Sequence, residues 1–247
     1  MAKLAGRIAV VTGASKGIGA GIAKELAAQG ATVVVNYASS KEGADKTVAE
    51  IVAAGGKAVA IGGSVAKPGE IDTLFAETKK HFGHLDILIN NAGVYNITPI
   101  TEATEAEIVR LFSINVTGLL LASKAAVALF PSTGGSIINI GSIAAENGMA
   151  GMSIYSGTKG AVNSITQSLA AELGPRKIRV NAVNPGMTVT EGAAGFVEGD
   201  MAKQMLPTIP LGRFGQPQDI ALAVAYLASD DARWITGGLI PVSGGQS

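Results

Sequence analysis

The sequence predicts one α/β domain in which a doubly wound parallel sheet of about seven strands is flanked by helices. Three observations predict it: short β-branched runs alternate with longer helical patterns, several runs are apolar without interruption, and glycines end several helical segments. Continuous apolar runs are typical of parallel strands covered on both faces. Regular strand–helix alternation favours right-handed crossovers between parallel strands. The 247 residues suit a single domain, 1–247, and no linker or repeat divides it.

The elements can be placed in chain order. The predicted strands are Ile8–Thr12, Thr32–Asn36, Ala58–Ile61, Ile87–Asn90, Ser136–Ile140, Val180–Val183 and Leu239–Val242. The predicted helices lie near 17–29, 40–54, 67–82, 104–130, 154–173 and 216–229. Gly30, Gly55-Gly56 and Gly174-Pro175 end three of them. Residues 186–215 are irregular and follow a strand, so we expect them to form a substrate lid at the ligand-binding edge of the sheet.

Composition argues against several classes of function. Nineteen basic and nineteen acidic residues cancel, so we expect no nucleic-acid partner and no anionic-membrane surface. The absence of cysteine excludes disulfides and thiolate metal sites, and it fits a cytoplasmic enzyme. No run reaches the roughly 18 apolar residues of a membrane span, and no signal core precedes the first strand. His81 and His84 have no neighbouring carboxylate cluster, so no metal site is expected.

A glycine-rich segment, Thr12-Gly13-Ala14-Ser15-Lys16-Gly17-Ile18-Gly19, follows the first strand and opens the first helix. Its glycines permit a tight turn and a close approach of backbone amides to a pyrophosphate, to which the helix adds positive potential. A plain strand–helix turn is the alternative for this segment taken alone. The dinucleotide interpretation predicts a Rossmann-type fold with cofactor contacts at Gly13, Ser15, Lys16, Gly17, Ile18 and Gly19.

Further motifs follow the glycine loop in a defined order: Asn90-Asn91-Ala92-Gly93, Asn115, Ser142, Tyr155-x-x-x-Lys159 and Asn184-Pro185-Gly186. In this set and order the chain resembles the short-chain dehydrogenase/reductase family over essentially its whole length. The resemblance implies hydride transfer between a nicotinamide and a carbonyl or alcohol. It also implies cofactor contacts at Asn91, Ala92, Gly93, Pro185, Gly186, Thr188 and Thr190.

The end of the second strand bears on which dinucleotide binds. An NAD-selective site places a carboxylate about 20 residues after the glycine loop, whereas this chain reads Val35-Asn36-Tyr37-Ala38-Ser39-Ser40. A 2′-phosphate would meet no repulsion there, and Lys16 with Ser39 or Ser40 would bind it. We therefore expect a preference for NADP(H), with use of both NADP(H) and NAD(H) as the alternative. Asn36 is a further candidate contact, as are Ser64 and Val65, which stand where the family usually has an Asp near the adenine.

Tyr155 and Lys159 are four residues apart on a predicted helix, so their side chains share one face. The spacing alone favours an ordinary surface pair, but together with Asn115, Ser142 and the glycine loop it favours catalysis. A free tyrosine has a pKa near 10, and a nearby ammonium is expected to lower it. Tyr155 is the predicted general acid/base and Ser142 the residue that positions the substrate oxygen. The resemblance adds ribose binding by Lys159 and a water-mediated proton relay at Asn115.

The substrate stays open between several classes. The leading hypothesis is a reductase or dehydrogenase for a small to medium neutral carbonyl or alcohol. A reductase of 3-oxoacyl groups on acyl carrier protein is the runner-up, favoured by Arg176, although 129–134 lacks a second expected cation. A glucose-type sugar dehydrogenase is suggested by Glu146, and a nucleotide-sensing regulator or an NAD-dependent epimerase is disfavoured by the motifs present. The resemblance also implies a homotetramer, with the helices at 104–130 and 154–173 paired across a dyad and the C-terminal strand in a second interface.

Overall fold

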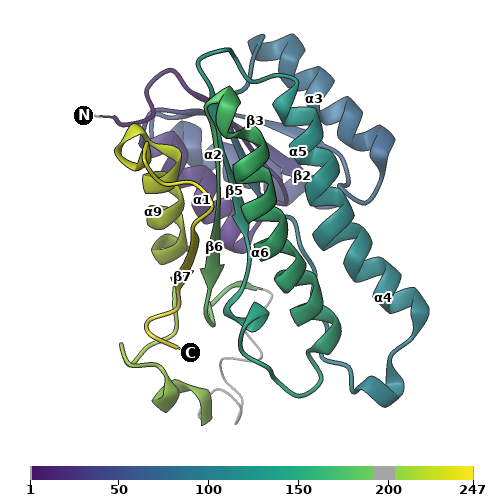
Figure 1. The fold of residues 1–247 in the computed structure, drawn as a ribbon. Coiled ribbons are helices and arrows are strands. Elements are labelled where there is room, and N and C mark those ends of the chain that lie inside the picture. Colours follow the sequence, from purple (N-terminus) through teal and green to yellow (C-terminus); the bar gives the residue numbers. More distant parts are fainter. Residues whose placement is uncertain (1, 192–203, 247) are drawn as a thin grey trace.

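Seven parallel strands form one sheet in the computed structural model, which describes residues 2–191 and 204–246. The strands are β1 (Ile8–Val11), β2 (Thr32–Tyr37), β3 (Lys57–Gly62), β4 (Ile87–Asn90), β5 (Gly135–Ile140), β6 (Ile178–Pro185) and β7 (Leu239–Val242). Their order is β3-β2-β1-β4-β5-β6-β7, and all neighbouring pairs are parallel. The direction of winding reverses between β1 and β4, which confirms the predicted doubly wound fold (Figure 1).

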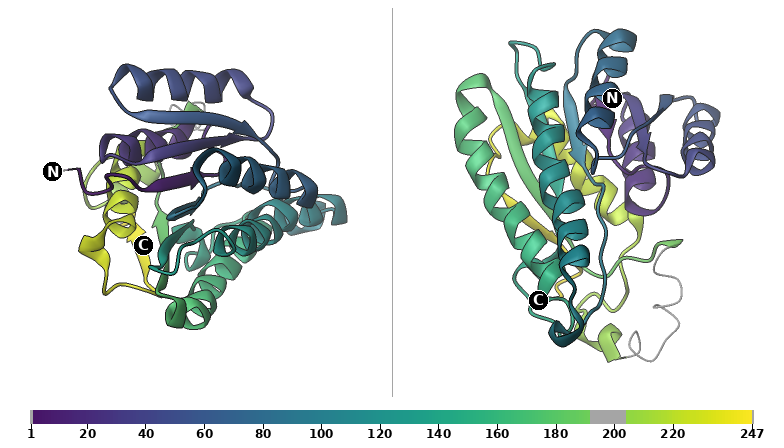
Figure 2. Two further views of the ribbon diagram at one scale, coloured as in Figure 1. Left: turned by 90° about the horizontal axis from the view of Figure 1, so that it is seen from above. Right: turned by 90° about the vertical axis from the view of Figure 1, so that its right-hand side faces the viewer.

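Helices cover both faces of the sheet (Figure 2). One face carries α1 (Gly17–Ala28), α2 (Lys41–Ala53) and α9 (Pro217–Ala228). The other carries α3 (Pro68–Phe82), α4 (Glu105–Phe112), α5 (Leu119–Val127) and α6 (Ser153–Leu173). Along β1, Ala9 and Val11 join the first core whereas Ile8 and Val10 join the second, because successive strand residues point to opposite faces. This double burial explains the uninterrupted apolar runs of the sequence.

The predicted helices and strands agree with the structure to within a few residues, apart from β6. The expected strand Val180–Val183 is in fact Ile178–Pro185, because it pairs with β5 along its first part and with β7 along its last. Asn184 interrupts the apolar pattern and conceals the true length of the strand. Single 3₁₀ turns occur at Ile100–Glu102, Ile143–Ala145, Gly174–Arg176, Leu206–Thr208 and Asp230–Ala232.

The helix expected at 104–130 contains a widened turn. A π-helical turn, η2 (Ser113–Gly118), joins α4 to α5, and buried Asn115 lies within it. Such turns insert an extra residue into an α-helix and are frequent at functional sites. The combined helix Glu105–Val127 is, among the described residues, the one helix that is long and apolar enough by length and composition to cross a membrane.

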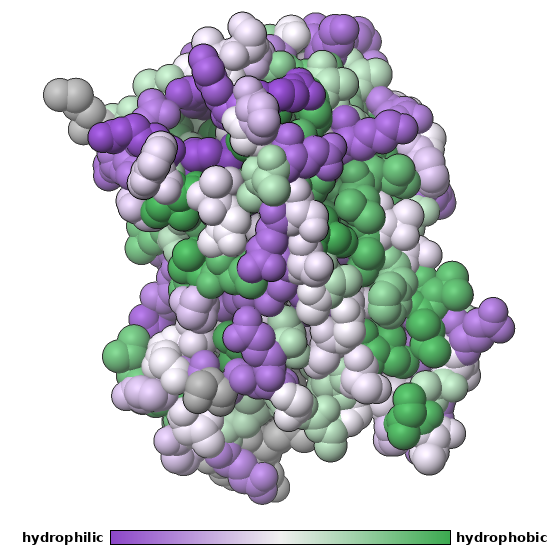
Figure 3. Space-filling view, viewed as in Figure 1, coloured by the Kyte–Doolittle hydropathy of each residue, from purple (hydrophilic) through white to green (hydrophobic). Residues whose placement is uncertain are grey.

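The apolar character of this long helix is divided between two surfaces. Leu111 and Ala122 are fully buried against the fold, whereas Val109, Phe112 and Leu120 are exposed. Apolar side chains gather over α4 and α5 on the right-hand side of Figure 3. The inward surface packs against α3 and α6. The outward surface leaves large apolar side chains exposed to solvent.

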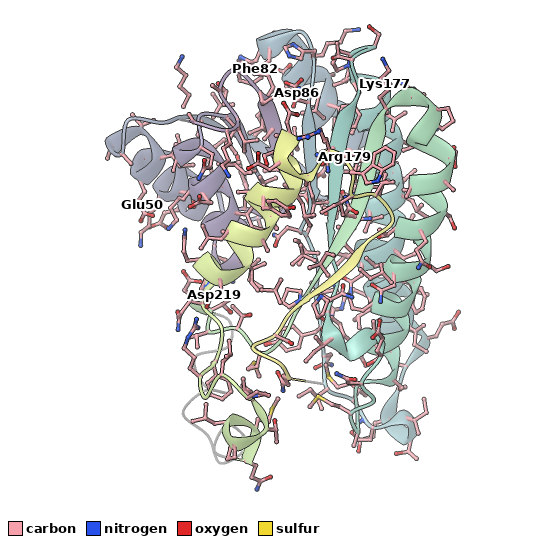
Figure 4. All side chains as sticks on the ribbon, turned by 60° about the vertical axis from the view of Figure 1, so that its left-hand side comes forward. Glu50, Phe82, Asp86, Lys177, Arg179 and Asp219 are labelled. Atoms are coloured by element: carbon pink, nitrogen blue, oxygen red, sulfur yellow. The ribbon has the colours of Figure 1, made fainter. Side chains whose placement is uncertain are left out.

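A charged cluster closes the amino-terminal edge of the sheet, where Figure 4 shows Asp86, Lys177 and Arg179. Arg7 lies 3.5 Å from the Asp86 carboxylate and 3.3 Å from that of Asp230. Arg179 donates a 3.2 Å hydrogen bond to the carbonyl of Ser229. These charges surround a hollow of about 490 Å³, which lies at the opposite end of the strands from every motif predicted to bind cofactor or substrate.

Candidate active site

The predicted motifs meet at the carboxyl-terminal edge of the sheet, where the strands β1, β4, β5 and β6 end next to one another. The glycine loop follows β1, and Asn91–Gly93 follow β4. Ser142 follows β5, and Gly186 follows β6. Parallel strands bring these segments together although the chain separates them widely, and this edge is where ligands bind in open α/β sheets.

The glycine loop packs directly on the segment after β4. Gly13 has φ +64, and a Cβ atom there would lie 2.9 Å from Ala92 Cα, so only glycine fits. The Thr12 hydroxyl accepts 3.0 Å hydrogen bonds from the N–H groups of both Asn91 and Ala92. The Asn91 amide in turn donates to the carbonyls of Thr12 and Gly13. These bonds hold the loop in one shape before any ligand binds.

The segment after β6 lies over the amino end of α1. Gly17, the first residue of that helix, has φ +57 and donates from its N–H to Glu191 Oε2 at 3.0 Å. Thr190 Cγ2 would lie 3.3 Å from a Cβ atom on Gly17. A helix amino terminus attracts anions, and it already holds a carboxylate here. Gly17 and Thr190, both predicted contacts, are thus brought together.

The residues expected to select the dinucleotide fall into two groups. Lys16 and Ser39 are exposed beside the loop, and no ion pair joins Lys16 to a carboxylate within the part of the chain that the structure describes. Ser40 caps α2 by accepting from Gly43 N–H. Asn36 is instead fully buried, accepts from Gly13 N–H at 3.3 Å and donates to the carbonyls of Ile61 and Gly63. Its side chain braces the glycine loop.

Ser64 and Val65 follow β3, directly after Gly63, whose carbonyl accepts a hydrogen bond from the Asn36 side chain. Ser64 N–H donates to Glu70 Oε2 at 2.8 Å, and the Ser64 hydroxyl accepts from Ala66 N–H. Val65 is buried against Gly118, where a Cβ atom would lie 2.7 Å from the Val65 carbonyl oxygen. The backbone there is therefore held by α3 on one side and by the π-helical turn on the other.

The catalytic candidates converge where β5 meets α6. The Ser142 hydroxyl is close enough to the Tyr155 phenol to lower its pKa, and it accepts from Ala144 N–H at 3.1 Å. Lys159 is buried, donates to the Ile140 carbonyl at 2.8 Å, and places its Nζ 5.6 Å from the centroid of the Tyr155 ring. The single turn of helix between Tyr155 and Lys159 aims both side chains at the end of β5, as their spacing predicts.

The ionisation of these two groups is dominated by burial. Burial raises the pKa of Tyr155, the hydrogen bond from Ser142 lowers it in part, and Tyr95 raises it further. Burial lowers the pKa of Lys159 from 10.5 to about 8. The expectation that the ammonium would bring the tyrosine pKa below its ordinary value is wrong for the protein without ligand, because the loss of hydration outweighs the other influences. Tyr155 is therefore a protonated phenol at neutral pH.

Asn115 joins the widened helical turn to the segment after β4. Its Oδ1 accepts from Val94 N–H at 2.9 Å, while its Nδ2 donates to the Val94 carbonyl at 2.8 Å and to Thr158 at 3.0 Å. A Cβ atom on Gly93 would lie 3.5 Å from Asn115 Oδ1 and 3.6 Å from Lys159 Nζ. Gly93, Asn115 and Lys159 therefore lie together. The two hydrogen bonds between the Asn115 side chain and the Val94 backbone form a clamp on the segment after β4. The water relay stays a prediction.

Comparison with known proteins identifies the family. Residues 13–247 match the family model described as enoyl-(acyl carrier protein) reductase. A short-chain dehydrogenase/reductase from Serratia marcescens has the same structure with a TM-score of 0.95 and 38% identity, covering 99% of both chains. This chain belongs to the short-chain dehydrogenase/reductase family. It is an NAD(P)-dependent oxidoreductase of that family.

Other members of the short-chain dehydrogenase/reductase family are similarly close. An uncharacterized oxidoreductase of Methylorubrum extorquens is 55% identical over 247 residues, or 99% of each chain. A hydroxynaphthalene reductase-like protein of Metarhizium majus is 41% identical, covering 98% of this chain and 95% of its own. The angucycline C-6 ketoreductase LanV, solved with bound NADP, has a TM-score of 0.93 and 36% identity over 99% of this chain and 96% of its own.

The segment that leads into the expected lid is partly described. Gly186 N–H donates to the Val242 carbonyl, and Thr188 Oγ1 donates to the carbonyl of Gly186. Val189 N–H donates to the Gly215 carbonyl at 2.8 Å, which joins the two ends of the segment. The central part of the expected lid, 192–203, lies outside the described residues, so its role stays a prediction.

Some residues that shape the candidate site of this short-chain dehydrogenase/reductase were not predicted as site residues. Thr12 supports the glycine loop, although its place at the head of the motif was the available signal. Asn139 donates to Thr166 and accepts from Asn90, which forms a buried polar chain beneath the site. Its signal was an Asn inside the apolar run of β5. Glu191 carried no recognisable signal, because its role depends on contact with a distant helix. Among the described residues, no group of three or more potential ligands is arranged to hold a metal ion.

Proposed function

We propose that this chain is an NADP(H)-dependent reductase that interconverts a ketone or aldehyde and the corresponding alcohol. The observation that carries the proposal is the cluster of Ser142, Tyr155 and Lys159 at the end of β5. The phenol lies beside the serine hydroxyl, which lowers its pKa, and a buried lysine lies 5.6 Å from its ring centroid. A proton donor, a second hydrogen-bond partner and a cation around one point are what carbonyl reduction requires.

The residues at the glycine loop fit a dinucleotide. The amino end of α1 presents a backbone donor that already binds a carboxylate, and the loop is too close to Ala92 for any side chain at Gly13. A dinucleotide held by these residues would supply or accept the hydride through its nicotinamide ring. The proposed contacts are Gly13, Ser15, Lys16, Gly17, Ile18, Gly19, Asn36, Ser39, Ser64, Val65, Asn91, Ala92, Gly93, Tyr155, Lys159, Pro185, Gly186, Thr188 and Thr190.

A preference for NADP(H) is supported by the charges at this site. The second strand ends without a carboxylate, and Lys16 after β1 and Ser39 after β2 are both exposed. A ribose phosphate would find a cation and hydroxyl donors there. Two similar structures, LanV and a blue fluorescent protein from a metagenomic library, were solved with NADP and NADPH respectively. NAD(H) is the second candidate.

The proposed proton transfer begins at Tyr155. Because burial raises its pKa, the phenol carries a proton that it can give to the carbonyl oxygen as hydride reaches the carbonyl carbon. Ser142 is proposed to hydrogen-bond the same oxygen. Lys159 is proposed to hold the ribose hydroxyls and to stabilise the phenolate that the transfer leaves, and Asn115 to support reprotonation from solvent.

A substrate panel tests this function. Neutral ketones, 3-oxoesters and sugars would be assayed by the oxidation of NADPH, or by reduction of NADP with the alcohols, using the wild type and Tyr155→Phe. Turnover of a carbonyl compound by the wild type, with loss of turnover in the variant, supports the proposal. Full turnover by the variant, or no redox reaction with any member of the panel, contradicts it.

Reduction of a 3-oxoacyl group on a carrier protein is the second candidate function. The matched family model is described as enoyl-(acyl carrier protein) reductase, which names the same carrier but a carbon–carbon double bond in place of a carbonyl group. Arg176, the cation expected to meet such a carrier, donates one bond to the Val127 carbonyl at 2.9 Å and stays exposed. A 3-oxoacyl thioester that fails to oxidise NADPH would remove this candidate, and glucose in the same panel tests the sugar dehydrogenase alternative raised by Glu146.

A homotetramer is the proposed assembly. Two separate apolar surfaces support it: Val109, Phe112 and Leu120 on α4 and α5, and Leu222, Tyr226 and Trp234 near α9, with Trp234 96% exposed. A monomer seldom exposes several large apolar side chains together, and oligomer interfaces would cover them. The outward apolar surface of the Glu105–Val127 helix would then face a second copy. Light scattering of the purified enzyme tests the assembly, and a stable monomer would contradict it.

A further inference from the structure

Tyr95 lies beside the catalytic tyrosine. The centroids of the Tyr95 and Tyr155 rings are 6.2 Å apart with planes at 69°, an edge-to-face arrangement. Tyr95 is nevertheless 56% exposed. More than half of its surface is therefore accessible beside the ring of the tyrosine that is proposed to meet the substrate oxygen.

The segment that carries Tyr95 is held at both ends. On one side, the Asn115 amide makes two hydrogen bonds to the backbone of Val94, of 2.9 and 2.8 Å. On the other side, Thr98 N–H donates to the Gly151 carbonyl at 2.8 Å. A tyrosine has few rotatable bonds, and a fixed backbone reduces the entropy lost when its ring meets a ligand.

The surroundings of Tyr95 favour an uncharged, apolar ligand. Neither 94–99 nor 147–152, the two segments that flank the catalytic tyrosine, contains a charged residue. Two carboxylates border them: Glu107 accepts hydrogen bonds from Asn96 and Thr98, and exposed Glu146 directly precedes the second segment. Ile97 and Met149 expose 48% and 43% of their surfaces there. Ile97 also lies against Gly151, so the two segments touch. An anionic substrate would find no cation in either segment, and the bordering carboxylates would repel it.

We propose that Tyr95 is a specificity-determining residue whose ring stacks on an aromatic ketone, so that the enzyme selects ketones fused to an aromatic ring. The inference rests on the proposed carbonyl reduction and names its substrate class. An aromatic pair contributes beyond the burial of area alone, by an amount that corresponds to a preference of about 3- to 10-fold over a saturated ring of similar size.

The test compares 2-tetralone, in which the ketone ring is fused to benzene, with 2-decalone, its saturated counterpart. The quantity measured is the ratio of kcat/KM for the two ketones with NADPH, so that a general loss of activity cancels. Tyr95→Phe retains the ring and should keep the wild-type ratio. Tyr95→Leu removes it and should lower the ratio about 3- to 10-fold, mainly through a higher KM for 2-tetralone. Tyr226→Leu, at an exposed tyrosine on α9, is the matched control and should leave the ratio unchanged.

A binding measurement separates ring recognition from catalysis. 2-Naphthol is flat, and titration calorimetry with the enzyme saturated by NADP measures its affinity without turnover. Tyr95→Leu should weaken binding about 3- to 10-fold and Tyr95→Phe should not. If the ketones are reduced but Tyr95→Leu changes neither the ratio nor the affinity, the inference is overturned while the proposed function stands. If 2-naphthol binding depends on Tyr95 but no ketone is reduced, ring recognition stands and the proposed function fails.

Discussion

The Glu191 carboxylate accepts a 3.0 Å hydrogen bond from the backbone N–H of Gly17, a residue 174 positions earlier in the chain. This bond places a negative charge from the segment after β6 at the amino end of α1. The partial positive charge of that helix end attracts anions, and the pyrophosphate of a dinucleotide is attracted to the same place. The side chain and the cofactor are therefore expected to compete.

Glu191→Gln should tighten the binding of NADPH by about 2- to 5-fold, because it removes a charge that repels the pyrophosphate from the helix end. Titration of the cofactor by fluorescence measures the dissociation constant. Glu172→Gln, at an exposed position of α6, serves as the control and should have no effect. Weaker binding in Glu191→Gln would show that the carboxylate assists the cofactor instead.

Tyr155→Phe should lower kcat at least about 100-fold, since the variant has no proton to give to the carbonyl oxygen. Binding of NADPH should change little because the ring and Lys159 stay in place. Single-turnover kinetics and a cofactor titration measure the two effects separately. Loss of cofactor binding in parallel with turnover would mean that the hydroxyl serves mainly to build the site.

Lys159→Met should abolish reduction and also raise the free energy of unfolding of the protein without ligand at neutral pH. Burial lowers the pKa of Lys159 to about 8 in the folded state, below its ordinary 10.5. The folded protein thus binds this proton less strongly than the unfolded chain, so the charged lysine destabilises the fold at pH values below 8. The gain should be about 1 to 2 kcal/mol after loss of the hydrogen bond to Ile140.

The same pKa sets the direction of the pH dependence. As pH rises from about 8 toward 10.5, the folded wild type loses the proton first, and its stability relative to Lys159→Met should recover. Urea denaturation of both proteins at neutral pH and near pH 9.5, within the window that linkage predicts, measures the difference. A difference that does not shrink with rising pH would show that the buried charge is not its cause.

In the wild type, NADPH-dependent kcat/KM should also fall above pH 8, as the cation beside the phenol is lost.

Asn115→Ala should lower the free energy of unfolding by about 2 kcal/mol, because it leaves the partly buried N–H and carbonyl of Val94 without their Asn115 partners. It should also raise KM for the ketone, since the segment that carries Tyr95 loses one of its anchors. Thr158→Val removes only one of the three bonds made by Asn115 and should cost about half as much. Equal effects from both variants would argue against the clamp at Val94.

Lys16→Glu should reduce kcat/KM with NADPH by about 10-fold or more while changing the value with NADH much less. The substitution replaces the proposed partner of the 2′-phosphate with a charge that repels it. Lys24→Glu, within the helix α1 that Lys16 precedes, provides a control for the change in net charge. A similar loss with both cofactors would contradict selection through Lys16.

Local patterns in the sequence determined the order of strands and helices, the glycine loop and the four catalytic candidates. Burial on both faces of the sheet imposes continuous apolar runs, and the helical repeat sets the spacing of Tyr155 and Lys159, so both are visible along the chain. The full length of β6 was not predicted from the apolar pattern. Pairing with β5 and β7 extends the strand through the polar residue Asn184.

Only the tertiary structure decided the features that depend on contacts between distant segments. The clamp between Asn115 and Val94 joins residues 21 positions apart, and the Thr12 hydroxyl reaches Ala92 across 80 positions. Glu191 and Gly17, which are also in contact, are 174 positions apart in the chain. The direction of the Tyr155 pKa shift belongs to this group as well, because it depends on how much water the folded chain removes from the phenol, and no spacing between residues encodes that burial.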